Sequence, residues 1–202
     1  MGRAKMDNRI QCWHFVSEDK RLRWGTRRTV EVGKTYSCRG PLVMCEHGMH
    51  GSRRIIDALQ YAPGPWICRV EIWGDVEEQT DKLVGRNRRV LAMVDGTRLL
   101  HLFACRVAER ALKKAHVTDK RSWRAIEVKR AWLDGGATDE ELAAAWDAAG
   151  AALDAALTAA WDAAGAAARA AAGAAAGAAR AIAGEVFNRY LTALVEREIR
   201  HA

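Results

Sequence analysis

The sequence predicts an α+β protein, in which a small mixed or antiparallel β domain with one short helix precedes an alanine-rich helical region. Residues 66–73 alternate side chains with a period of two, as a strand with one buried face does. From residue 98 the apolar side chains recur at helical spacing. From residue 142 to about 195 nearly every residue is a strong helix former. We therefore expect a β-rich domain over residues 1–97 and a helical region over residues 98–202.

Several apolar or alternating segments of the first domain are predicted strands. In the longest, Trp66, Cys68, Val70 and Ile72 share one face, which is the expected core face. The predicted strands are residues 11–16, 29–32, 42–45, 66–73 and 83–93.

One short helix is predicted between these strands, from Arg53 to about Tyr61. Ser52 precedes its first apolar residues and is the expected N-cap, because its hydroxyl can accept from an unpaired backbone N–H. The sequence Pro63-Gly64-Pro65 ends the helix.

The second half contains at least three predicted helices. The first begins near Arg98, and the second spans residues 120–133. The third begins at Thr138, which has the spacing of a capping box with Glu141. Whether residues 142–195 form one helix or two is left open by the pattern.

Large apolar side chains form a stripe on the alanine-rich segment, at steps of four and seven residues. A long helix with such a stripe must bury it, so we expect an oligomer or partner surface there. An apolar face returns near residue 190 and belongs to the same predicted surface. Its residues are Trp146, Leu153, Leu157, Trp161, Phe187 and Tyr190.

The 202-residue chain has a net charge of +7. Residues 1–100 hold 18 Lys and Arg against 12 Asp and Glu, so the basic character belongs to the first half. Such a surface attracts an acidic protein, a nucleotide or a nucleic acid, or it serves only solubility. The nucleic-acid alternative has no recognised motif behind it. It would use Arg53, Arg54, Arg86, Arg88 and Arg89.

The cysteines and the N-terminus indicate a cytoplasmic protein. The five cysteines are odd in number and scattered, which favours reduced thiols. No apolar segment follows Met1 as it would in a signal peptide. We expect no membrane span, because the Ala/Gly run contains Arg169 and Arg180 and few large apolar side chains.

Residues 45–52 (CEHGMHGS) place a thiol, a carboxylate, two imidazoles and a hydroxyl in one glycine-punctuated turn. This turn is the centre of the candidate ligand site. His50, the second histidine of the turn, has an alternative structural role, since an imidazole can hold a turn by hydrogen-bonding to nearby backbone. The candidate ligand-binding residues are His14, Cys45, His47, His50, Ser52 and Glu71.

Metal and nucleophilic chemistry fit this turn poorly. The spacing of Cys38, Cys45, His47 and His50 matches no zinc pattern that we can justify. A thiolate–imidazole pair would lack a separate acid to orient the imidazole. We therefore expect no metal and no cofactor, and we assign no catalytic residue.

The order of elements is similar to that of ADP-ribosyltransferase-like folds. It runs from a strand with His14, through the turn at residues 48–52 and a helix, to a strand that ends at Gly74. This resemblance implies that His14 and Ser52 face NAD. It also implies that one of Glu71, Glu77 or Glu78 acts as the acid, while His50 stands where an aromatic residue is usual.

A second resemblance covers residues 29–95. The segments GKTY, CEHGMHGS, DALQY, VEIWG and DK occur here in that order. They resemble an uncharacterised domain family of phages, prophages and bacterial genomes, with the pattern GKTY, C-E-x-G-F/L-H-A-C/S, D-x-L-x-Y and V-E-x-x-G. Met49-His50-Gly51 stands where Phe/Leu-His-Ala is usual. The resemblance implies no particular activity.

The helical segment of residues 99–150 is similar to bacterial immunity proteins. Together the resemblances imply a non-enzymatic phage or mobile-element protein that regulates a host or defence component in the host cytoplasm. It would bind a protein partner or itself through the Ala/Trp-rich helices. The alternatives are a nucleotide-binding or ADP-ribosyltransferase-like protein that uses His14, His50 and Ser52, and a basic nucleic-acid-binding protein.

Overall fold

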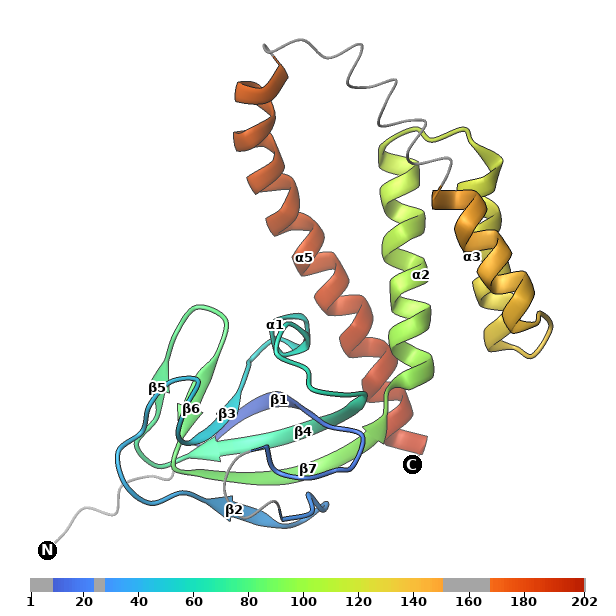
Figure 1. The fold of residues 1–202 in the computed structure, drawn as a ribbon. Helices are drawn as coiled ribbons and strands as arrows, with labels where there is room; N and C mark the ends of the chain where they lie inside the picture. Colours follow the sequence, from blue (N-terminus) through green and yellow to red (C-terminus); the bar gives the residue numbers. More distant parts are fainter. Residues whose placement is uncertain (1–8, 24–27, 151–167, 202) are drawn as a thin grey trace, which may run out of the picture. The chain divides into compact units, whose positions relative to one another are not determined.

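The computed structural model describes residues 9–23, 28–150 and 168–201, and the side chains of residues 168–183 are not among those described. These residues form two compact units (Figure 1). The β unit contains the described residues up to Thr97 and those from Asn188 onward. The helical unit is Arg98–Phe187.

Two antiparallel sheets form the β unit. The main sheet has the order β1-β4-β7-β2, and the smaller one has the order β3-β6-β5. With the helices described below, this arrangement confirms the predicted α+β class. The strands are β1 (Ile10–Val16), β2 (Thr35–Ser37), β3 (Met49–Gly51), β4 (Trp66–Trp73), β5 (Glu77–Glu78), β6 (Leu83–Gly85) and β7 (Asn87–Asp95).

The core of the β unit lies between these sheets. Cys68, Val70 and Ile72 of β4 are fully buried, as their alternation predicts, and Leu83 of β6 belongs to the same cluster. Ile67 is also fully buried, although it was expected on the mixed face of the strand. Both faces of β4 therefore carry buried apolar side chains.

The end of the chain belongs to the β unit. Helix α5 (Ala168–His201) carries Leu191 and Val195, which are fully buried. Asn188 Oδ1 accepts a hydrogen bond of 3.2 Å from the backbone N–H of Ile56, in the short helix α1 (Ile55–Leu59). This bond supplies a partner to an N–H in the first turn of α1, which its own helix leaves unpaired.

Two of the predicted strands are wrong. Over residues 29–32 no ladder forms, because the Tyr36 hydroxyl donates to the Thr29 carbonyl (2.8 Å) and accepts from the Glu31 N–H (2.9 Å). Over residues 42–45 the chain turns, and the N–H and carbonyl of Val43 both bond to His47 at 2.8 Å.

The N-cap prediction is also wrong. The N-cap residue of α1 is Arg54, and no side chain caps the helix. Ser52 instead pairs its backbone with Trp13, in two hydrogen bonds of 2.8 and 3.0 Å.

The predicted strand over residues 83–93 is two strands, β6 and β7. Strand pairing is interrupted between Gly85 and Asn87, where β6 ends and β7 begins.

The helical unit follows its predicted pattern closely. Helix α2 is Thr97–Lys114, α3 is Lys120–Leu133, and residues 139–150 are helical. The capping box is present: the Thr138 N–H donates to Glu141 Oε2 (2.8 Å), and the Glu141 N–H donates to Thr138 Oγ1 (3.2 Å). No helix in the described part of the chain is long and apolar enough to cross a bilayer.

The predicted partner stripe is described only in part. Trp146 is 61% exposed, and Phe187 packs edge-to-face on Phe103 with ring centroids 5.8 Å apart. Leu153, Leu157 and Trp161 lie outside the described residues. Part of the segment 142–195 also lies outside them, so the choice between one helix and two stays open.

Candidate functional site

A cavity of about 440 Å³ lies within the β unit. Strands β1 and β3, helix α1 and the segments beside them form its wall. Four of the six predicted ligand-binding residues line it together: His14, Cys45, His50 and Ser52. Its apolar wall contains Trp13, Phe15, Val16, Leu22, Met49, Ala58, Tyr61 and Pro63.

The charged lining of this cavity is entirely cationic. Arg21, Arg23, Lys82 and Arg88 line it, and no Asp or Glu does. Of these, Arg21 also pairs with Asp19, which lies outside the lining, at 3.9 Å. The cavity therefore carries a positive potential that favours an anion.

Arg88 is the deepest of the four cations, with only 3% of its surface exposed. It lies on β7, where strand alternation directs it to the buried face between Asn87 and Arg89. Its Nη1 donates to the backbone carbonyl of His50 at 3.0 Å. Its Nε has no hydrogen-bond partner, and no carboxylate of the described residues pairs with it.

Burial lowers the pKa of Arg88 to about 10, so the guanidinium stays charged at neutral pH. A buried charge without a counter-ion is costly, because the interior replaces little of the solvation that water gave it. The neighbouring Cys68 and Tyr36 partly offset this effect on the Arg88 pKa.

His14 lies in the middle of β1, opposite Cys68 of β4. Burial, together with the charge of Arg88 and the nearby His50, lowers the pKa of His14 well below its ordinary value. The imidazole is therefore neutral at pH 7. It lines the cavity and has no hydrogen bond to another described residue.

His50 is held by the backbone of the turn. Its Nε2 accepts a hydrogen bond of 3.0 Å from the N–H of Cys45. Burial lowers the pKa of His50, with the Arg88 charge acting the same way, while bonds to the carbonyls of Gly48 and Val43 raise it in part. This is the arrangement expected of a histidine that fixes a turn, so the neutral ring contributes shape to the site.

Cys45, Lys82 and Tyr61 lie together in the lining, and Cys45 and Tyr61 are exposed. Lys82 Nζ donates to the Tyr61 hydroxyl at 3.4 Å, and that hydroxyl donates to the carboxylate of Asp81. Hydrogen bonds to the Cys45 thiol and to Tyr61 raise the pKa of Lys82. These three residues carry the part of the site that is reached from solvent.

The two remaining predicted site residues do not line the cavity. His47 Nδ1 is 2.8 Å from the carbonyl of Pro41, and Glu71 forms an ion pair with Arg9 at 3.4 Å. The other acids implied by the transferase resemblance also lie elsewhere. Glu78 pairs with Arg53 through a hydrogen bond of 2.9 Å, and Glu77 is exposed on β5.

Lys82, Tyr61 and Arg88 were not among the predicted site residues. Arg88 is predicted only as one of the basic residues of the nucleic-acid alternative. One signal in the sequence indicates its burial. Arg88 is an even number of residues from Val84 and Val90, so in an alternating strand its side chain lies on the same face as these apolar side chains. Lys82 and Tyr61 offer no comparable signal.

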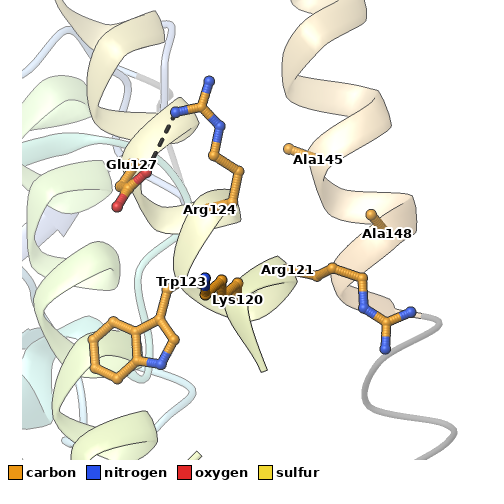
Figure 2. Close-up of a pocket in the computed structure, with 7 residues that line it drawn as sticks. All are labelled: Lys120, Arg121, Trp123, Arg124, Glu127, Ala145 and Ala148. Atoms are coloured by element: carbon orange, nitrogen blue, oxygen red, sulfur yellow. Dashed lines mark hydrogen bonds and ion pairs between the residues drawn. The ribbon is translucent and has the colours of Figure 1, made fainter. Parts of the chain in front are cut away.

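A second hollow, of about 520 Å³, lies in the helical unit between α3 and residues 139–150 (Figure 2). Four of its five polar side chains are already paired. Arg124 bonds to Glu127 at 3.3 Å, Arg121 bonds to Asp119 at 2.6 Å, and Trp123 Nε1 donates to the Val117 carbonyl at 2.8 Å. It therefore makes a weaker candidate site than the cavity of the β unit.

Metal ligands are not grouped in the part of the chain that the structure describes. No set of three or more His, Cys, Asp or Glu there is placed to hold an ion. All five cysteines are free thiols.

Residues 10–102 match the model of a family described as a domain of unknown function (DUF7666). This match contains every residue that lines the cavity of the β unit. It confirms the resemblance to an uncharacterised domain family in that coarse form. Neither the curated proteins nor the solved structures contain a match to the chain.

Proposed function

We propose that the β unit binds a small anionic molecule of nucleotide size, with Arg88 as the anchor for its negative charge. The observation that carries this proposal is a guanidinium 3% exposed, with an unpartnered Nε, in the wall of a cavity that no carboxylate lines. An anion placed there supplies the missing counter-charge.

The hydrogen bonds of Arg88 suggest how the anion sits. Nη1 is committed to the His50 carbonyl, and Nε is unpaired but closed off from the cavity by its neighbours. The anion therefore meets the Arg88 charge from the cavity side of the guanidinium, as a charge-assisted contact. His14 lines the same cavity and offers a further hydrogen-bonding nitrogen to the ligand.

The volume and the apolar wall support an organic ligand beyond the anionic group. Small-molecule sites typically enclose roughly 300–1,000 Å³ behind largely apolar walls with a few placed polar groups. The cavity, at about 440 Å³, has this composition. A nucleotide combines a phosphate with an apolar ring face, so it fits better than a bare inorganic ion.

The proposal includes binding but no ADP-ribosyl transfer. Such chemistry would need an acid in the cavity, and Glu71, Glu77 and Glu78 do not line it. The nucleic-acid alternative has less support from the geometry. Arg88 is buried, and Arg53 and Arg86 are paired with Glu78 and Asp75.

Thermal shift and calorimetry with NAD, ADP-ribose, cyclic nucleotides and orthophosphate test this proposal, with the neutral nucleoside adenosine as the ligand control. A ligand at a hundred times its Kd stabilises the protein by about 2.7 kcal/mol, a shift of several degrees. We expect such a shift with at least one nucleotide and none with adenosine.

Two arginine variants supply the matched control. Arg88→Gln should abolish the shift while circular dichroism shows an intact fold. Arg89→Gln removes the same charge from the neighbouring, exposed position and should keep the shift. No shift with any anion, or a shift that survives in Arg88→Gln, would contradict the proposal.

A second function, in the helical unit, is proposed from the exposed side chain of Trp146, which is 61% accessible. Tryptophan is a frequent anchor of protein contacts, and the proposed contact is with a second copy or with a host component. This retains the expected role of a regulatory protein of phage or mobile-element origin in the cytoplasm. A solution mass above one chain that Trp146→Ala returns to the monomer would support it, and a monomeric wild type that captures no protein from a host lysate would contradict it.

A further inference from the structure

Cys45 differs from the other four cysteines in its surroundings. Cys12, Cys68 and Cys105 are buried, and burial raises the pKa of Cys12 and of Cys68 to about 12. Cys38 is partly buried, and its thiol points at the carbonyl of Arg86 at 3.6 Å. Cys45 is exposed and lines the cavity of the β unit.

Cys45 lies among cationic side chains. Lys82 hydrogen-bonds to the Cys45 thiol, and Arg21, Arg23 and Arg88 line the same cavity, whose lining contains no Asp or Glu. Reactive cysteines are found in such partly exposed, electropositive surroundings, because the thiolate is the nucleophile. Asp81 accepts a hydrogen bond from Tyr61, and Glu46, the residue after Cys45, does not line the cavity.

Arg88 supplies a second, independent observation in the same cavity. It is buried in the cavity wall, its Nε has no partner, and no carboxylate of the described residues pairs with its charge. The cavity therefore has an exposed thiol at its solvent side and a cation without a counter-ion at its buried side. A molecule that reacts with Cys45 can extend a negative group toward Arg88.

We propose that Cys45 is a modification site that forms a mixed disulfide with a small, carboxylate-bearing disulfide, whose negative group enters the cationic cavity. The preference for a negative reagent rests on the proposed anion-binding function. The Cys45 thiol loses its proton to solvent, and the thiolate attacks one sulfur of the reagent. One S–S bond forms as the reagent's own S–S bond breaks, and the other half leaves as a thiolate. The attached group fills the cavity and excludes the anionic ligand, which gives redox control of binding.

Three aliphatic disulfides of similar size but different charge test this proposal: anionic 3,3′-dithiodipropionate, neutral 2-hydroxyethyl disulfide and cationic cystamine. The rate of mixed-disulfide formation is followed by intact mass, and the modified residue is located by peptide mapping. Each rate is divided by the rate for the unfolded protein, which removes the intrinsic reactivity of the reagent. We expect the anionic reagent to modify Cys45 about five- to tenfold faster than the neutral one, with cystamine slowest. Since exposed charges are screened, 1 M salt should remove most of the preference.

Matched variants assign the effect to Cys45. Cys45→Ser should abolish the fast modification, and Cys38→Ser should leave it unchanged. Lys82→Gln should reduce the advantage of the anionic reagent. First modification at Cys38 or Cys105, or equal normalised rates for the three reagents, would overturn the proposal.

Nucleotide binding, measured on the reduced wild-type protein, separates this proposal from the proposed function. A protein that binds a nucleotide but shows no charge preference overturns the thiol proposal alone. A charge preference at Cys45 without binding of any anion overturns the proposed function alone.

Discussion

Arg88 and His50 are joined by a hydrogen bond of 3.0 Å, from the guanidinium Nη1 to the backbone carbonyl. The donor lies on β7 of the main sheet, and the acceptor lies on β3 of the smaller sheet. The bond therefore ties Arg88, the proposed anion anchor, to β3, the strand that follows the turn with Cys45. This bond holds the Arg88 guanidinium against β3.

Arg88→Met is expected to preserve or raise stability while it removes anion binding. The substitution deletes a buried charge that lacks a counter-ion, which is often neutral or stabilising, and it also deletes one hydrogen bond to the His50 carbonyl. These effects oppose each other, so we expect the free energy of unfolding in urea to fall by less than about 1 kcal/mol, or to rise.

Ile72→Ala supplies the comparison for this measurement. It opens a hole in the core between the sheets and should cost about 2–5 kcal/mol. If Arg88→Met costs as much as Ile72→Ala, Arg88 is a structural residue and not an anion anchor.

His14 and His50 are expected to respond differently to the same substitution. His50→Gln removes the rigid ring that accepts from the Cys45 N–H and bonds to the carbonyls of Gly48 and Val43, and it should destabilise the β unit by about 1–2 kcal/mol. His14→Gln removes no hydrogen bond to a described residue, so it should cost less than about 1 kcal/mol. Urea unfolding of the two variants and the wild type checks this order, and the reverse order would contradict the roles given to the two rings.

The regular elements of this fold could be predicted from the sequence because local periodicity determines them. β4 and α3 have the predicted bounds, and the capping box at Thr138 forms as its spacing indicates. Residues 29–32 were predicted wrongly for a physical reason. Their alternation is that of a strand, but the hydroxyl of Tyr36 satisfies the backbone groups that a neighbouring strand would otherwise pair.

The site was predictable only in part, because it depends on contacts between distant segments. His14, Cys45, His50 and Ser52 meet in one cavity, and three of them come from a single chemistry-rich turn. Lys82 and Arg88 reach the cavity only through the pairing of β6 with β3 and of β7 with β4, which no local pattern specifies. The burial of Leu191 and Val195 in the β unit likewise depends on the return of the chain end.

Stability is expected to fall as the pH drops below about 6.5. Burial lowers the pKa of His14 and His50, so the unfolded chain takes up protons in this range before the folded protein does. Since the unfolded state then binds more protons, its free energy falls relative to that of the folded state. His101 in the helical unit acts in the same direction, because burial and Lys129 lower its pKa.

Urea midpoints at pH 5.5 and 7.5 measure this dependence. The wild type should have the lower midpoint at pH 5.5, and the difference should be smaller in His14→Gln, which lacks one of the three histidines. Lys82 and Arg88 stay charged across this range, so they do not contribute to the slope. An equal difference in both proteins would show that His14 does not titrate as its burial requires.

Gly48 is expected to be the most sensitive glycine of the site. Its φ of 138° is unfavourable for a side chain, and a Cβ there would overlap the side chain of Val84 and lie 3.1 Å from Leu42 Cδ2. Gly33 has a φ of 84° but nothing within 4 Å of its Cβ position, so Gly33→Ala measures the backbone cost alone. We expect Gly33→Ala to cost about 1–2 kcal/mol, and Gly48→Ala to cost about 1–3 kcal/mol more because of the overlap.

Thermal unfolding and nucleotide binding of the two glycine variants complete this test. Gly48 also lines the cavity, so its variant should lose ligand affinity together with stability, whereas Gly33→Ala should keep its affinity. Equal losses of stability would mean that the turn at residues 45–52 moves away from β6 at little cost. A turn that moves so readily could not hold Cys45 and His50 in place against Arg88, and the preformed cavity on which both proposals depend would have to be abandoned.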